Sequence, residues 1–204
     1  MPLGRAESTE DKWSYLTIFA CYCNLLFIVG DVLLVDKVSP RVLKNQNAGD
    51  VVLFSPPSKL RDIVSANGGS LTSRDLFVKR VAASSGDRVK VNAAGEVFVN
   101  GKLADGRRDL CEAEPLRLIE KYVKETKEEQ ILGPDEVFVL GDCGSVSIDS
   151  RVWGPLKTEN IVGKPILRLW PSERFGSIQE LPNTLKSVDT TSVPTTMDSD
   201  VWRE

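Results

Sequence analysis

The stretch "LFVKRVAASSGDRVKV", residues 76–91, reads as a β-strand, a turn and a second strand, with a lysine inside the first apolar pattern. Alternate residues of a strand project to one face, so Phe77, Lys79 and Val81 share a face. A lysine on the exposed face of an edge strand is the more frequent situation. A buried lysine, whose charged form burial disfavours, can instead accept a proton from a hydroxyl. The other motifs of the chain must decide between these interpretations.

Composition limits both the fold and the chemistry. A chain of 204 residues with 41% hydrophobic content predicts one globular domain with appended segments. Its 26 basic and 29 acidic residues give a net charge of -3, so no basic field points to a nucleic-acid partner. Histidine is absent, which excludes Ser-His-Asp and Cys-His catalysis and most catalytic zinc sites. The four cysteines match no metal-site spacing, and neither a disulfide framework nor a cofactor is expected.

The composition divides the chain into four segments. Residues 1–12 are polar, and residues 13–29, "WSYLTIFACYCNLLFIV", carry no charge. This run of 17 residues is at the lower limit for a helical membrane anchor, and a buried helix or strand of the domain is the competing interpretation. Residues 30–175 alternate short apolar runs with turn residues. Residues 176–204 are rich in Ser, Thr, Asp and Pro and are expected to be disordered.

The segment 30–175 predicts a mainly β domain. Its clearest element is "VKVNAAGEVFVNGK", two alternating strands around Asn92–Gly95, with Asn100-Gly101 supplying the next tight turn. Between Cys111 and Gly133 the apolar residues recur at helical spacing among Lys and Glu, which predicts a surface amphipathic helix.

A second motif, "GDCGSVSIDSRVWGPL", covers residues 141–156. Asp149 and Arg151 stand two apart and could pair, and Ser147 or Ser145 could hydrogen-bond an amine. Loops that combine Asp, Ser and Gly are usually plain turns, so this motif is weak evidence when it is taken alone.

Read in order, the motifs resemble the type I signal peptidase (leader peptidase) family. They are "GDVLLVDKVS", "GDVVLFSPP", "LFVKRVAASSGDRVKV", "VFVNGK" and "VFVLGDCGSVSIDSRVWGPL", followed by "IVGKPILRLWP". The bacterial and chloroplast thylakoidal branch is the most similar, over about residues 30–175. The resemblance implies a membrane-anchored β-fold serine endopeptidase that removes signal sequences from translocated preproteins. The implied partners are preproteins and membrane lipid, and the implied location is the thylakoid or a bacterial-type inner membrane, with a single N-terminal anchor.

The same resemblance assigns roles in a Ser-Lys dyad. Lys79, in the Lys-Arg-Val motif, corresponds to the general base, and Ser147 to the serine that orients the lysine. Asp149 and Arg151 correspond to the supporting ion pair, and Asp142 of the same motif is assigned a supporting role. No metal is implied.

The sequence departs from the family pattern in two places. Cys143 and Gly144 stand where the family has Asn-Arg. The family's nucleophilic serine, in a Ser-Met-x-Pro-Thr motif, has no counterpart, because no serine lies between Ser14 and Ser39. Without gaps, its position falls on Tyr22.

Three explanations of the missing serine follow. The chain can be a truncated or alternatively spliced form of an active peptidase, which is the explanation we favour. It can be a pseudoenzyme that binds preproteins without cutting them. Cys23 or Cys21 can replace the serine, although an apolar neighbourhood makes a thiol a poorer nucleophile.

Overall fold

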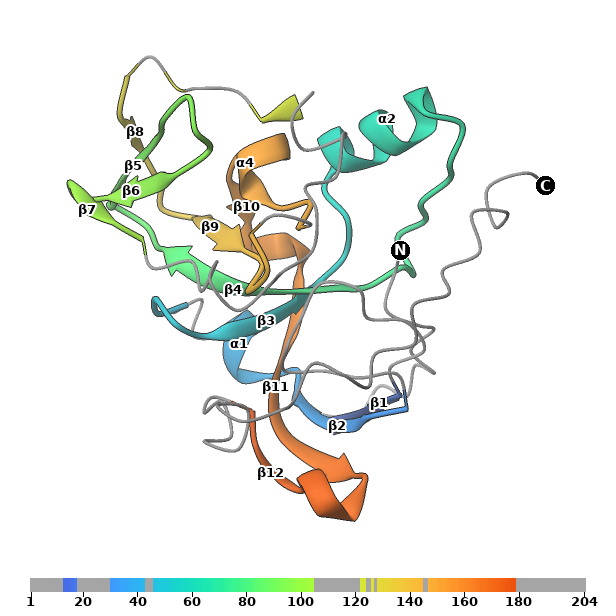
Figure 1. The fold of residues 1–204 in the computed structure, drawn as a ribbon. Helices are drawn as coiled ribbons and strands as arrows, with labels where there is room; N and C mark the ends of the chain where they lie inside the picture. Colours follow the sequence, from blue (N-terminus) through green and yellow to red (C-terminus); the bar gives the residue numbers. More distant parts are fainter. Residues whose placement is uncertain are drawn as a thin grey trace, which may run out of the picture.

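The computed structural model describes residues 13–17, 30–42, 46–104, 122–123, 126, 128–144 and 147–178. Within these residues two antiparallel sheets form the fold (Figure 1). The large sheet has the strand order β1-β2-β11-β3-β4-β9-β10, and β12 pairs with β11. Its strands are β1 (Trp13–Thr17), β2 (Val32–Asp36), β3 (Val51–Phe54), β4 (Phe77–Ala83), β9 (Glu136–Leu140), β10 (Leu156–Lys157), β11 (Ile161–Trp170) and β12 (Gly176–Ser177).

The small sheet has the order β7-β6-β5-β8. Its strands are β5 (Arg88–Val91), β6 (Val97–Val99), β7 (Lys102–Leu103) and β8 (Gln130–Ile131). Asn100 and Gly101 both have positive φ, 51° and 77°, which is the backbone that a two-residue hairpin turn between β6 and β7 requires. The helical elements are α1 (Ser39–Val42), α2 (Ser58–Ala66), α4 (Ser150–Trp153), η2 (Thr158–Asn160) and η3 (Ser172–Arg174).

Three apolar clusters pack on these sheets, and β4 contributes to all of them. Val78 belongs to a cluster with β2 and β3 residues, whereas Val81 belongs to a second cluster with Trp153 of α4 and Leu60 of α2. Ala83 joins the third cluster, which lies under the small sheet. Because residues of β4 pack into all three clusters, the strand is held in the interior of the fold.

A buried ion cluster holds the start of β2. Asp31 has no exposed surface, and its Oδ2 lies 3.2 Å from Nε of Arg168 on β11. The other carboxylate oxygen accepts a hydrogen bond from Arg174 of η3. The cluster therefore attaches the far end of β11 to the residue that enters β2, at the end of the molecule where Figure 1 shows η3 and β12.

The mainly β class is confirmed, but two expected boundaries differ. The β structure extends beyond residue 175, because Gly176–Ser177 form β12 and Ile178 is 1% exposed. The helix expected between Cys111 and Gly133 is wrong at its C-terminal end, where Gln130–Ile131 form β8 and pair with β5. Tertiary pairing overrode the helical spacing there. Residues 105–121 lie outside the described residues, as does the segment 179–204.

The structure describes only part of the apolar run 13–29. Trp13–Thr17 form β1, which pairs with β2, and residues 18–29 lie outside the described residues. In the described part of the chain no helix is long and apolar enough to cross a membrane. The membrane anchor stays a prediction.

Candidate active site

Lys79 lies on an interior strand, so the edge-strand interpretation is wrong. β4 pairs with β3 on one side, where Lys79 stands opposite Val52, and with β9 on the other. Lys79 is 5% exposed. An amine at such a depth is rare unless its site has a use for it, because burial removes the water that solvates the charged form.

Ser147 and the end of the Lys79 side chain both approach Gly141. Gly141 directly follows β9. A Cβ atom added to it would overlap the side chain of Ser147 and lie 3.3 Å from Nζ of Lys79. Ser147 is fully buried, and its hydroxyl has no hydrogen-bond partner within the described residues. A hydroxyl in that position can bond to an amine that approaches it.

Asp149 and Arg151 form a buried ion pair behind Ser147. Two nitrogens of Arg151 donate to the two oxygens of Asp149, at 2.9 and 2.8 Å. Asp149 also caps α4 through the backbone N–H of Arg151 and accepts from the N–H of Gly141 at 3.1 Å. Burial by itself would lower the pKa of Arg151, but the hydrogen bond and the charge of Asp149 raise it overall. The carboxylate therefore joins the strand end at Gly141 to the helix that follows Ser147.

Arg80 and Asp142 form a second ion pair, which connects β4 to the loop after β9. Nε and Nη2 of Arg80 donate to the two oxygens of Asp142 at 2.9 and 3.1 Å, and Nη1 donates to the carbonyl of Gly49 at 2.9 Å. Because Arg80 follows Lys79 on β4, this fork aligns the strand that bears the lysine with the loop that bears Ser147.

The loop between the two ion pairs contains a disulfide-bonded cysteine, although the sequence predicts no disulfide framework. Cys143 is disulfide-bonded and 3% exposed. The other three cysteines, Cys21, Cys23 and Cys111, lie outside the described residues. The spacing of four cysteines in a chain of this length gives no sign of which ones pair, so the sequence offered no signal for this bond.

The segment expected to carry the nucleophile lies outside the described residues. Tyr22, Cys21 and Cys23 all lie in the segment 18–29, and Ser145 is also outside the described residues. In the described part of the chain no cluster of three or more His, Cys, Asp or Glu side chains could hold a metal ion.

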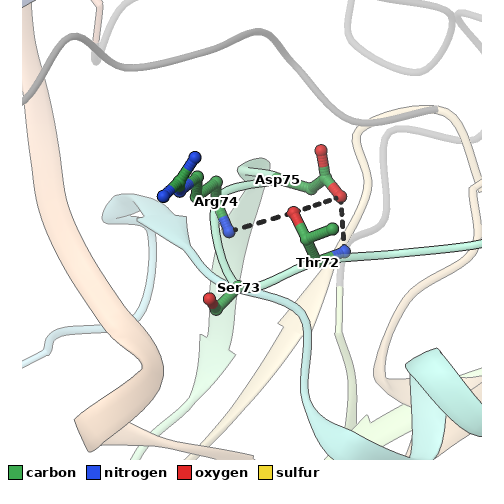
Figure 2. A pocket seen from close by; sticks show the side chains of 4 residues that line it. All are labelled: Thr72, Ser73, Arg74 and Asp75. Atoms are coloured by element: carbon green, nitrogen blue, oxygen red, sulfur yellow. Dashed lines mark hydrogen bonds between the residues drawn. The ribbon is translucent and has the colours of Figure 1, made fainter.

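A separate open pocket of about 440 Å³ lies in the loop between α2 and β4 and is lined by Thr72, Ser73, Arg74 and Asp75. Figure 2 shows that its polar groups mostly bond one another: Asp75 accepts from the backbone N–H of Thr72 at 2.6 Å and from its hydroxyl at 3.1 Å. The pocket contains none of the candidate site residues, and we assign it no role in the chemistry.

The sequence motifs did not identify two residues of the site, Arg80 and Gly141. Arg80 follows Lys79 on β4, but nothing in the sequence indicated that Asp142, 62 positions away, receives its guanidinium. Gly141 was read only as part of a turn. Position 141 has to be glycine because a Cβ there would meet the side chains of Ser147 and Lys79.

Comparison with known proteins identifies the family. The family model "Signal peptidase, peptidase S26" matches residues 26–170. The chain belongs to this signal peptidase family. Its motifs around Lys79 and Ser147 lie inside the matched range.

Individual relatives agree with this assignment. Thylakoidal processing peptidase 1, chloroplastic, of Arabidopsis thaliana is 34% identical over 145 residues, which are 71% of this chain and 38% of the relative. Probable signal peptidase I-1 of Synechocystis is 35% identical over 153 residues, which are 73% of this chain and 67% of the relative. Probable signal peptidase I-2 of Synechocystis is 30% identical over 157 residues, 74% of this chain and 61% of that relative. The chain thus spans little more than a third of the plant signal peptidase homologue.

Proposed function

We propose that this chain is the catalytic domain of a signal peptidase of the kind that removes signal sequences from preproteins at a membrane, with Lys79 in the place of the general base and no serine at the family's nucleophile position. The observation that supports the proposal most directly is the approach to Gly141 of a buried amine and of a buried hydroxyl that has no hydrogen-bond partner among the described residues. A general base at this position takes the proton of an attacking nucleophile and later delivers it to the leaving amine of the cut peptide bond.

In this proposal Ser147 is a positioning residue and not the nucleophile. It has no exposed surface, so a peptide carbonyl cannot reach its oxygen without rearrangement of the loop. Its hydroxyl orients the lysine amine, while the ion pairs of Arg151 with Asp149 and of Arg80 with Asp142 hold the two backbone segments together. The nucleophile has to come from a segment other than these.

The unmodified chain is expected to leave a signal-peptide substrate uncut, because it has no serine at the position of the family's nucleophile. Insertion of a family-type Ser-Met-x-Pro-Thr segment before Gly30 is expected to give cleavage, and Lys79→Met in that background is expected to abolish it. The readout is mass spectrometry of the cleaved peptide. Cleavage by the unmodified chain that survives both Cys21→Ala and Cys23→Ala would show that the nucleophile lies elsewhere.

The second candidate function is a preprotein-binding module without peptidase activity. It is favoured by the absence of any serine between Ser14 and Ser39. Binding of a fluorescent signal peptide, measured by anisotropy, separates the two functions. A chain that binds the peptide but stays inactive after the serine segment is inserted supports the binding module.

A membrane surface is the partner that we propose for the end of the domain around η3. Trp170 is 58% exposed and Phe175 is 62% exposed, and Arg174 lies between them in the chain. Exposed aromatic side chains next to a cation are typical of protein surfaces that meet lipid headgroups. The exposed aliphatic residues Leu103 and Ile131 lie on the small sheet instead.

Substitution of Trp170 and Phe175 by serine is expected to weaken binding to anionic phospholipid vesicles by about tenfold or more, because burial of one large apolar side chain contributes about 1.5–3 kcal/mol and 1.4 kcal/mol is tenfold. The measurement is sedimentation with vesicles. The matched control, Leu103→Ser with Ile131→Ser, removes two similarly exposed side chains and is expected to leave binding unchanged. Equal losses in the two double variants would rule out a membrane face at η3.

A further inference from the structure

Two tight turns, one before β3 and one after β4, are built in the same way. In the first, the N–H of Asn47 donates to the carboxylate of Asp50 at 2.8 Å, and the N–H of Asp50 donates back to the carbonyl of Asn47 at 3.0 Å. In the second, the same two bonds join Ser84 and Asp87, also at 2.8 and 3.0 Å. The third residue of each turn is a glycine with positive φ, 96° in the first and 84° in the second. A turn of this kind closes through its own bonds.

The first turn makes two further contacts that its own closure does not need. Nζ of Lys164 on β11 donates to the same oxygen of Asp50 that accepts within the turn, and the two side chains of this ion pair are only 18% and 15% exposed. The carbonyl of Gly49 accepts from Nη1 of Arg80 at 2.9 Å. The carboxylate of Asp87, in contrast, accepts only from uncharged donors within the described residues. The extra contacts of the first turn therefore connect it to other parts of the fold.

These contacts lead toward the candidate site. The N–H of Gly49 donates to the carbonyl of Val81, and the N–H of Val81 donates to the carbonyl of Asp50, both at 2.8 Å, so the turn is joined to β4. Nε and Nη2 of Arg80 donate to Asp142 at 2.9 and 3.1 Å. Because a guanidinium is planar and rigid, the bond at Nη1 sets the plane in which the other two nitrogens reach Asp142. The path of contacts thus ends in the loop after β9.

We propose that Asp50 is a positioning residue for Lys79. Its ion pair with Lys164 anchors the turn to β11, the anchored turn directs the carbonyl of Gly49 at Arg80, and Arg80 then holds the loop after β9 against the strand that carries Lys79. Asp50 acts through Arg80 and takes no part in the chemistry. The catalytic meaning of this inference rests on the proposed function, whereas the path of contacts does not.

The first test measures the reactivity of Lys79 in the full chain, by limited acetylation with an amine reagent and peptide mass spectrometry. Asp50→Ala is expected to speed the modification of Lys79 by about tenfold or more, as a local opening of the loop does. Asp87→Ala removes the same kind of turn acceptor and is expected to change this rate by less than about twofold. Hydrogen exchange at the amide of Val91 in β5 is expected to stay unchanged in Asp50→Ala, whereas a general loss of stability would speed both processes together.

A double-variant cycle decides whether Asp50 acts through Arg80. Arg80→Gln is expected to speed the modification of Lys79 by itself, and addition of Asp50→Ala is expected to change the rate by less than about twofold further, because the path is already broken. Asp50→Asn keeps the turn acceptor and loses the charge, so it is expected to reproduce most of the effect of Asp50→Ala. The proposal is overturned if the effects of Asp50→Ala and Arg80→Gln multiply, if Asp50→Asn leaves Lys79 unchanged, or if Asp87→Ala matches Asp50→Ala.

The second test uses the chain with the inserted serine segment. Asp50→Ala is expected to lower kcat for a signal peptide by about tenfold or more and to change KM by less than about twofold, because the path ends at the loop beside Lys79 and not at a substrate contact. A change in KM alone would contradict the positioning role. If the chain with the inserted serine cuts no peptide at all, the proposed function fails, and the reactivity of Lys79 still decides whether Asp50 positions it.

Discussion

Replacement of Gly141 by alanine is expected to disable the candidate site and to lower the free energy of unfolding by about 1–3 kcal/mol, the range for an overpacked interior. The added Cβ would overlap the side chain of Ser147, which is fully buried. It would also lie 3.3 Å from Nζ of Lys79, closer than ordinary van der Waals contact. The Lys79 amine and the Ser147 hydroxyl would therefore have to move apart to make room for the added methyl group.

The effect on chemistry is expected to exceed the effect on stability. A displacement of about 1 Å in a catalytic group can lower a rate by about a hundredfold. In the chain that carries an inserted serine segment, Gly141→Ala is therefore expected to reduce signal-peptide cleavage by about that factor or more. The readouts are initial cleavage rates and urea denaturation followed by tryptophan fluorescence.

Two control variants define the cause. Gly133→Ala adds the same methyl group where the nearest atom is the end of the Glu136 side chain at 3.3 Å, and it is expected to change stability by less than about 0.5 kcal/mol. In the double variant Gly141→Ala with Ser147→Gly, the overlapping side chain is gone, so most of the lost stability is expected to return. If the double variant is as unstable as the single one, the close approach to Ser147 is not the reason for the glycine.

Removal of the Asp149 carboxylate is expected to give the largest loss of stability at the site, about 3–5 kcal/mol, which is the usual result of leaving one charge of a buried pair without its partner. The Asp149 side chain has no exposed surface, and that of Arg151 is 7% exposed. In Asp149→Ala the guanidinium keeps its backbone acceptors at Gly144 and Ser147 but loses both carboxylate bonds. The N-terminal cap of α4 and the acceptor for the N–H of Gly141 are lost as well.

The measurement is urea denaturation, with Asp62→Ala as the matched control. Asp62 is exposed on α2, and its substitution is expected to change the free energy of unfolding by less than about 0.5 kcal/mol. Asp149→Ala with Arg151→Met removes both charges, and it is expected to be more stable than Asp149→Ala alone. A loss below about 1 kcal/mol in the single variant would mean that water or another group replaces the carboxylate.

Much of this architecture could be predicted from local patterns. The alternation around Lys79 assigned Phe77 and Val81 to one face and Val78 to the other, and the structure sends these residues into different apolar clusters. The Asn100-Gly101 turn was readable because few residue pairs adopt positive φ at both positions. These features depend only on neighbours within a few residues, so the local sequence is enough to predict them.

Other features depend on which segments meet. Apolar residues before Gly133 do recur at helical spacing, but Gln130–Ile131 pair with β5, so tertiary pairing decided their conformation. The disulfide of Cys143 and the ion pair of Arg80 with Asp142 depend on contacts that no local pattern in the sequence indicates.

The sequence by itself determined a mainly β signal peptidase domain, a lysine on an apolar face, and the lack of a serine at the family's nucleophile position. Only the tertiary structure decided that β4 is an interior strand, that Lys79 and Ser147 both approach Gly141, and that two ion pairs hold the adjoining segments. The reason is that strand periodicity is a local property of the backbone. The burial of an amine, in contrast, depends on which strands pair on either side of it and on which loop then covers its end.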